Sequence, residues 1–196
     1  MARVPLRPLL TEIRGCTVCA PSLPAGPRPV VQAASKARVV IIGQAPGRKV
    51  HETGIPWDDP SGDRLRTWLG VERDTFYDPN SFALVPMGFC YPGTSKGADL
   101  PPRPECAPLW HEPLLSALPN IELYLLFGRY AQARYLGDKA SKRLTDTVAN
   151  WRSFTPRLIP MPHPSPRNQG WLVRNPWFED EVIPYMQRRL KRLGLR

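Results

Sequence analysis

One histidine of the sequence lies in a proline-rich segment that restricts its backbone, and it could take part in catalysis. In "PMPHPSPRN", residues 160–168, His163 ends an apolar run and has prolines at positions 162, 164 and 166. Proline fixes its own φ and restricts the residue before it, so this segment holds the imidazole in a defined place. An imidazole can donate a hydrogen bond or transfer a proton. His163 is therefore a candidate for acid–base or hydrogen-bond chemistry, although a histidine that caps a strand end has the same pattern.

The four cysteines are a second candidate. Cys16 and Cys19 form a C-x2-C pair, while Cys90 and Cys106 stand far along the chain. A C-x2-C pair brings two thiolates to one metal centre, and the other two cysteines complete a four-sulfur set. Disulfides are disfavoured in a chain that we expect in the cytoplasm, and four unrelated structural cysteines are an alternative. The wide spacing of the second pair favours an iron–sulfur cluster, with zinc as the other possibility.

The composition is basic, and this points to a polyanionic partner. Lys and Arg number 27 against 17 Asp and Glu, which gives a net charge of +10. Nucleic acid is the common partner of such a chain, and solubility alone is the alternative. No apolar run approaches the roughly 18 residues of a membrane span. The start, "MARVPLRPLL", has no long apolar stretch of the kind found in a secretory leader, so we expect neither secretion nor a membrane partner.

Alternating strands and helices must position these residues. Apolar runs predict strands at 37–43, 81–89, 121–128 and 157–162. Helical spacing of apolar residues predicts helices near 7–16, 61–69, 106–118, 129–152 and 176–193, with Ser61 as the cap of the second. This alternation predicts an α/β fold, a three-layer α/β/α sandwich with a central, mainly parallel four-stranded sheet. The length of 196 residues fits a single domain, 1–196.

Three unusual loops follow the predicted strands. They span residues 44–60, 88–105 and 162–170. Ligands of parallel α/β sheets bind at the carboxyl ends of the strands, so the three loops should line one crevice.

Several motifs in these loops resemble those of the uracil-DNA glycosylase superfamily. "IIGQAPG", 41–47, resembles its first motif, and "HPSPRN", 163–168, its second. The cysteine spacing is similar to that of the family 4 enzymes, which carry a [4Fe–4S] cluster, and "TGIPWDDPSGDRLRTWLG", 53–70, resembles a family 4 stretch. The resemblance covers nearly the whole chain, and the order and spacing of its short motifs make it specific.

The resemblance implies a reaction and a role for each motif. The family cleaves the bond between a damaged base and deoxyribose after the nucleotide is flipped into a pocket. His163 would donate to the negative charge that builds on the leaving base, and Trp57 takes the place of a stacking Phe. The implied base-binding residues are Gln44, Ala45, Gly47 and Trp57, and the implied DNA-binding residues are Ser165, Arg167 and Asn168. The implied cluster ligands are Cys16, Cys19, Cys90 and Cys106.

Two positions depart from the family pattern. Gln44 stands where family 4 has an acid, and a glutamine can orient water but cannot take its proton. Pro86 stands where the middle strand normally delivers an Asn that reads the base edge. Asp58 or Asp59, which directly follow the stacking residue, are candidates to compensate. The predicted catalytic set is therefore Gln44, Asp58, Asp59 and His163.

These observations predict a monofunctional, hydrolytic DNA glycosylase. Its substrate would be DNA with a flipped-out uracil or a similar deaminated base such as hypoxanthine. We expect a cytoplasmic, nucleoid-associated monomer with a [4Fe–4S] cluster. One alternative is a protein of the same fold that binds a damaged base without cutting it or cuts very slowly. Another is a hydrolase of free nucleotides.

Overall fold

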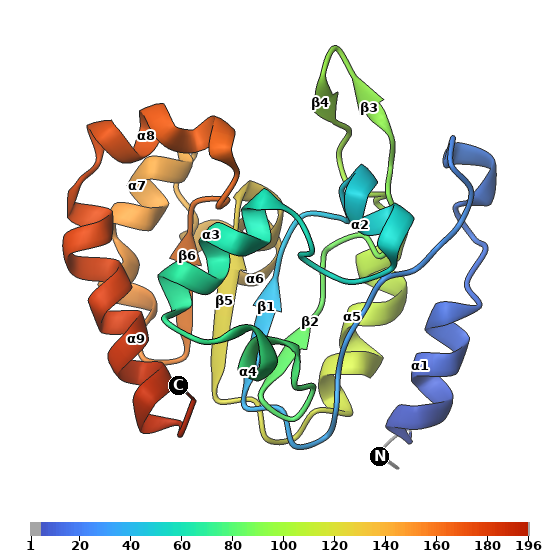
Figure 1. Ribbon diagram of the computed structural model, residues 1–196, viewed down its shortest axis with the longest axis horizontal. Helices are drawn as coiled ribbons and strands as arrows, with labels where there is room; N and C mark the ends of the chain where they lie inside the picture. Colours follow the sequence, from blue (N-terminus) through green and yellow to red (C-terminus); the bar gives the residue numbers. More distant parts are fainter. Residues whose placement is uncertain (1–4, 196) are drawn as a thin grey trace.

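Four parallel strands form the centre of the molecule (Figure 1). The structure is a computed structural model that describes residues 5–195. The strands lie in the order β2–β1–β5–β6. Their bounds are Val39–Ile42 for β1, Phe82–Leu84 for β2, Leu123–Phe127 for β5 and Leu158–Met161 for β6. Each strand is a short apolar run that is almost entirely buried, as parallel strands are when helices cover both faces.

The helices form two outer layers because alternate strand residues point to opposite faces. On one face, Val39 and Ile41 belong to a buried cluster with Trp68 and Met186. The helices of this layer are α3 (Pro60–Leu69), α4 (Arg73–Tyr77), α7 (Leu144–Ala149), α8 (Gln169–Arg174) and α9 (Ile183–Arg192).

The opposite face of the sheet carries the second cluster. Val40 and Ile42 pack there with Ile13 and Leu114. The helices of this layer are α1 (Leu6–Arg14), α5 (Cys106–Ser116) and α6 (Arg129–Leu136). The predicted three-layer α/β/α fold is thus confirmed, and the sheet is parallel throughout.

Two of the predicted loops contain regular structure that the sequence did not indicate. The loop after β1 includes α2 (Arg48–Thr53), and the loop after β2 includes a hairpin of β3 (Thr94–Ser95) and β4 (Ala98–Asp99). Lys96 and Gly97, at the tip, both have left-handed φ values, 49° and 75°. Two left-handed residues are what a tight two-residue hairpin requires. The hairpin projects above the carboxyl ends of the strands (Figure 1).

The start of α3 differs from the prediction in one respect. The cap is Asp59 rather than Ser61, because the Asp59 carboxylate accepts a hydrogen bond from the Gly62 N–H at 2.8 Å. Asp59 precedes Pro60, and proline is favoured at the first helical position. The predicted region 129–152 divides into α6, the short turns Gly137–Lys139 and Trp151–Phe154, and α7 between them.

Within residues 5–195, none of the helices has both the length and the apolar character needed to cross a membrane. The prediction that the chain has no leader rests partly on residues 1–4, which lie outside the described residues.

Candidate active site

A cavity of about 400 Å³ opens at the carboxyl edge of the sheet. Its wall includes Val30 as well as residues from the segments that follow β1, β2 and β6, most of them in the three predicted loops. After β1 these are residues 43–47, 50, 56, 57, 59 and 61; after β2, residues 86, 98 and 99; and after β6, residues 163, 165, 167 and 168. The three loops therefore meet at one crevice, in the place where ligands of parallel α/β sheets bind.

His163 is held as a neutral imidazole with its proton on Nε2. The backbone N–H of Ser165 donates to Nδ1 at 3.2 Å, so Nδ1 is an acceptor and carries no proton. Burial lowers the pKa of the ring, and the nearby Asp59 carboxylate only partly opposes this effect. At neutral pH the ring is therefore uncharged, and its single proton must lie on Nε2. The group that His163 can offer to a ligand in the cavity is the Nε2–H donor.

The segment that carries His163 is braced from two directions. The side-chain amide of Asn168 donates to the His163 carbonyl at 2.7 Å. From α3, the Arg64 guanidinium donates to the Ser165 carbonyl at 3.1 Å and to Gln169 Oε1 at 2.9 Å. Arg64 thus ties the loop after β6 to the helix that follows the first motif, and sequence reasoning did not single it out.

Trp57 has a strained backbone and packs closely against the end of β1. Its φ is 58°, in the left-handed region that bulky residues rarely adopt. A Cβ on Gly43 would lie 2.6 Å from Cζ2 of the indole, and one on Gly62 would lie 1.7 Å from the Trp57 carbonyl oxygen. Only glycine allows these approaches. The indole and the His163 ring lie 5.5 Å apart between centroids, at 31°. Trp57 and His163 therefore form one preorganised aromatic wall.

Two carboxylates turn toward the cavity, from Asp59 and Asp99. If Gly47 carried a Cβ, that atom would lie 3.8 Å from Asp59 Oδ2 and 3.9 Å from Asp99 Oδ2. The pKa of Asp99 is raised, mainly by burial and also by the Asp59 charge, while Arg167 acts in the opposite direction. Asp99 was not predicted as a site residue. The sequence feature that could have indicated it is the Lys96–Gly97 pair, because a glycine at such a turn is typical of a hairpin within the predicted loop 88–105.

Gln44 and Asp58 have partners that the sequence could not indicate. The Gln44 side-chain amide lines the cavity and donates to the Leu100 carbonyl at 3.2 Å. Asp58 does not line the cavity; its carboxylate accepts from the Arg73 guanidinium at 2.9 Å. All of the predicted catalytic, base-binding and DNA-binding residues except Asp58 line the cavity, where their roles stay predictions.

Pro86, which also lines the cavity, is held from behind by a buried histidine. His111 lies 3.0 Å from the Pro86 carbonyl through Nε2 and 2.6 Å from the Tyr135 hydroxyl through Nδ1. A carbonyl only accepts, so Nε2 carries the proton and Nδ1 accepts from Tyr135. Burial lowers the pKa of His111 to about 4, so the ring is neutral. His111 thereby fixes the wall position where the family normally has a base-reading Asn.

The four cysteines come from segments that approach one another. Cys106 has its pKa raised to about 12, mainly by burial, and the charges of Cys90, Cys19 and Cys16 add to this effect. The Phe89 N–H donates to Cys106 Sγ at 3.3 Å, and the Arg28 backbone lowers the pKa of Cys90 by a hydrogen bond. Four thiols within electrostatic reach, with N–H donors on two of them, are a donor set suited to an iron–sulfur cluster.

Their arrangement is not that of a closed metal site. Within residues 5–195 there is no group of three or more His, Cys, Asp or Glu side chains placed to hold a metal ion. The metal site therefore stays a prediction.

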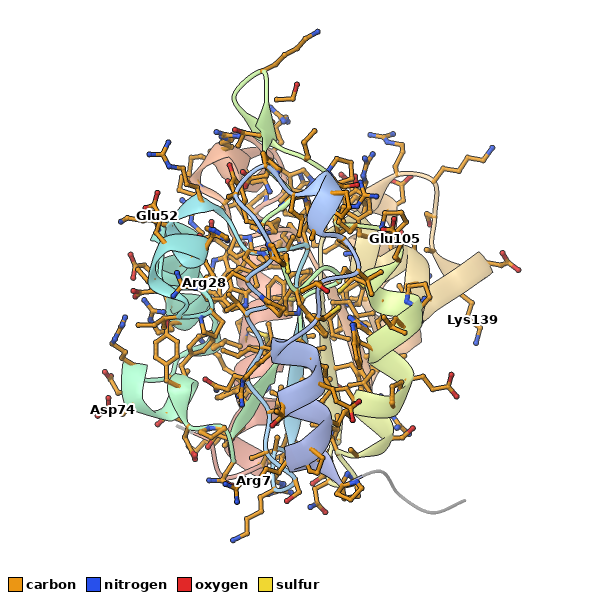
Figure 2. All side chains as sticks on the ribbon, turned by 90° about the vertical axis from the view of Figure 1, so that its right-hand side faces the viewer. Arg7, Arg28, Glu52, Asp74, Glu105 and Lys139 are labelled. Atoms are coloured by element: carbon orange, nitrogen blue, oxygen red, sulfur yellow. The ribbon has the colours of Figure 1, made fainter. Side chains whose placement is uncertain are left out.

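Arg28 connects the cysteine region to the cavity loop, because its guanidinium donates to the His51 and Glu52 carbonyls at 2.6 and 2.8 Å. Figure 2 shows Arg28 on the side of the molecule that carries Glu52.

The fold and the site together define a class of protein: a parallel α/β protein with a cavity of about 400 Å³ at the carboxyl edge of its sheet, walled by a tryptophan and a neutral histidine donor. A comparison with protein families agrees with this description. The family model described as the Uracil DNA glycosylase superfamily matches residues 30–187. The chain belongs to the uracil-DNA glycosylase superfamily, a family that acts on DNA.

Proposed function

We propose that this protein is a DNA glycosylase that hydrolyses the N-glycosidic bond of a flipped-out deaminated base, uracil or a similar base such as hypoxanthine. The observation that carries the proposal is the hydrogen bond from Ser165 N–H to His163 Nδ1, which leaves Nε2–H as a fixed donor at the cavity. As the glycosidic bond breaks, the base departs with the bonding electrons. A neutral donor held in place stabilises this developing anion without reorganisation.

The other wall residues support the same reaction. Trp57 offers an indole face or edge to an extruded base, and stacking of this kind is worth about 1–3 kcal/mol. The glycines and the positive φ that hold Trp57 keep this surface in place before substrate arrives. Pro86 offers no side-chain amide, so discrimination among bases depends on backbone groups near Gln44 and Gly47 and on cavity shape.

DNA would reach the cavity along the loop after β6. Arg167 lines the mouth, and Ser165 and Asn168 stand beside it. The net charge of +10 favours attraction of DNA phosphates. We propose that Arg167, Ser165 and Asn168 contact the DNA strand next to the flipped nucleotide.

Base release is the direct test. Single- and double-stranded oligonucleotides with one uracil or one hypoxanthine are incubated with the protein and then treated with alkali, which breaks the strand at abasic sites. We expect breaks at the modified position, and His163→Ala should slow base release about 100- to 1,000-fold because the donor to the leaving base is lost. Binding to an uncleavable 2′-fluoro substrate should change less than threefold.

The same assay separates the rival functions. Tight, base-dependent binding with no strand breaks identifies a protein that captures damage without cutting it. Release of bases from free nucleotides, with indifference to DNA, identifies a nucleotide hydrolase. Either result contradicts the glycosylase proposal.

We also propose that Cys16, Cys19, Cys90 and Cys106 hold a [4Fe–4S] cluster, as in the family 4 enzymes that the motifs resemble. The donor set supports this, because four cysteine sulfurs from separate segments lie within electrostatic reach of one another and two of them accept backbone N–H hydrogen bonds. The cluster would tie the segment after α1 to the start of α5. Protein purified without air should be brown and contain iron and sulfide; a colourless protein with one equivalent of zinc would point to the zinc alternative.

A further inference from the structure

The β3–β4 hairpin brings a carboxylate to the cavity mouth. Asp99 ends β4 and pairs with Thr94 of β3 across the hairpin. Ala98 and Asp99 both line the cavity, although the hairpin itself is exposed. Figure 1 shows the hairpin standing over the carboxyl ends of the strands, near α2. Asp99 therefore reaches the site from an element that belongs to neither family motif.

Gln44 fixes the base of this hairpin. Its amide Nε2 donates to the carbonyl of Leu100, the residue after Asp99, at 3.2 Å. The Leu100 N–H in turn donates to the Gly93 carbonyl at 2.9 Å, which closes the hairpin. A carboxylate at position 44 has no proton to donate to the Leu100 carbonyl and would repel both this oxygen and Asp99. The glutamine in the first motif is thus matched to the hairpin.

Asp99 is better placed than Asp59 to take a proton. Oδ1 of Asp59 is committed to the Gly62 N–H at the start of α3. Within residues 5–195, the Asp99 carboxylate has no hydrogen-bond partner, and the charges of Arg167 and Asp59 act on it. Burial raises the pKa of Asp99, the Arg167 charge partly opposes this rise, and the Asp59 charge adds to it. Such a carboxylate is suited to general-base chemistry.

We propose that Asp99 is the catalytic carboxylate of this protein, the group that receives the proton of the attacking water, and that Gln44 positions it. The proposal rests on the glycosylase function proposed above. The C1′–N bond breaks and its electron pair leaves with the base, whose charge accepts the hydrogen bond from His163 Nε2–H. A water oxygen forms the new bond to C1′, and a water proton passes to Asp99. The base anion then takes up a proton from Asp99 or from solvent, so one water yields the free base and an abasic sugar.

The test compares single-turnover base release with binding. Asp99→Asn keeps the size of the side chain and removes its basicity, and Asp138→Asn is the matched control at an exposed carboxylate outside the cavity. Base release is measured on a substrate that the wild-type protein cleaves, and binding on the same sequence with an uncleavable 2′-fluoro nucleotide. We expect Asp99→Asn to slow release about 100-fold or more while binding stays within threefold. Asp138→Asn should match the wild type in both.

Gln44 is tested in two backgrounds. Gln44→Ala should slow release in the wild-type background but have little further effect in the Asp99→Asn background, because its role is to place Asp99. Gln44→Glu should also be slower than the wild type. A Gln44→Glu protein that is faster than the wild type overturns the positioning role.

The outcomes separate this proposal from the function on which it rests. If the wild-type protein releases base and Asp99→Asn does so within threefold of its rate, the role of Asp99 is wrong and the glycosylase function stands. If the wild-type protein releases no base from any substrate, the proposed function fails, and the role of Asp99 fails with it.

Discussion

The buried His111 should make the free energy of unfolding of this protein decrease in acid, and replacing this histidine should remove that part of the pH dependence. Its ring is neutral in the folded protein because burial lowers its pKa from 6.5 to about 4. An unfolded chain returns the ring to water, where it takes up a proton below about pH 6.5. Acid therefore favours the unfolded state over the interval between these two values.

The size of the effect follows from the shift. A change from 6.5 to about 4 corresponds to about 3 kcal/mol of unfolding free energy. This contribution is fully present above pH 6.5, is lost as the pH falls toward 4, and changes little below that. Roughly 2 kcal/mol should already be lost at pH 5. With a urea dependence of about 2 kcal/mol/M, the midpoint of unfolding should move by about 1 M.

His111→Gln provides the comparison, because glutamine does not titrate. Urea unfolding of both proteins is measured at pH 7.5 and pH 5. The variant is expected to be less stable at both values, since its hydrogen bonds to Pro86 and Tyr135 are altered. The quantity of interest is the difference between the two pH values, in which other titrating groups, His163 among them, cancel. The wild type should lose about 2 kcal/mol more than the variant.

An equal loss in both proteins would refute the reasoning. It would mean that the His111 ring takes up its proton as easily in the folded state as in the unfolded one. The Nδ1 atom of His111 could then not be the acceptor of the Tyr135 hydroxyl proton, because that hydrogen bond requires a neutral ring.

Two further predictions concern the cavity. Gly43→Ala would place a Cβ 2.6 Å from the Trp57 indole, so the ring must move, and base release should fall roughly 10- to 100-fold. Gly15→Ala is the control. A Cβ at position 15 would make only ordinary contacts, at 3.6 and 3.7 Å, so this variant should retain the wild-type rate. A wild-type rate in Gly43→Ala would show that Trp57 need not be fixed. Arg167→Ala should reduce the steepness with which the logarithm of the DNA-binding constant falls with the logarithm of the salt concentration, by about 0.9, the value for one phosphate contact. An unchanged slope would show that Arg167 does not contact the DNA backbone.

The sequence by itself determined the layers and the edge of the sheet where the site lies. Runs such as Val39–Ile42 are apolar and β-branched at every position, which is typical of a strand buried on both faces. The order of strands and helices then placed the loops after β1 and β6 together, so the sequence alone indicated that Gln44, Trp57 and His163 lie at one cavity. These patterns are local, and they predict the strands and helices correctly because each of these elements forms from residues that are neighbours in the chain.

The tertiary structure decided which side chains are free to act. Asp59 and Asp58 look equivalent in the chain, but one caps α3 beside the cavity and the other pairs with Arg73 outside it. The proton on Nε2 of His163, the support of Pro86 by His111, and the approach of Asp99 to Gly47 all depend on hydrogen bonds or packing across the fold. Such contacts join residues tens of positions apart, and their geometry is set by how the layers pack, which local patterns do not encode.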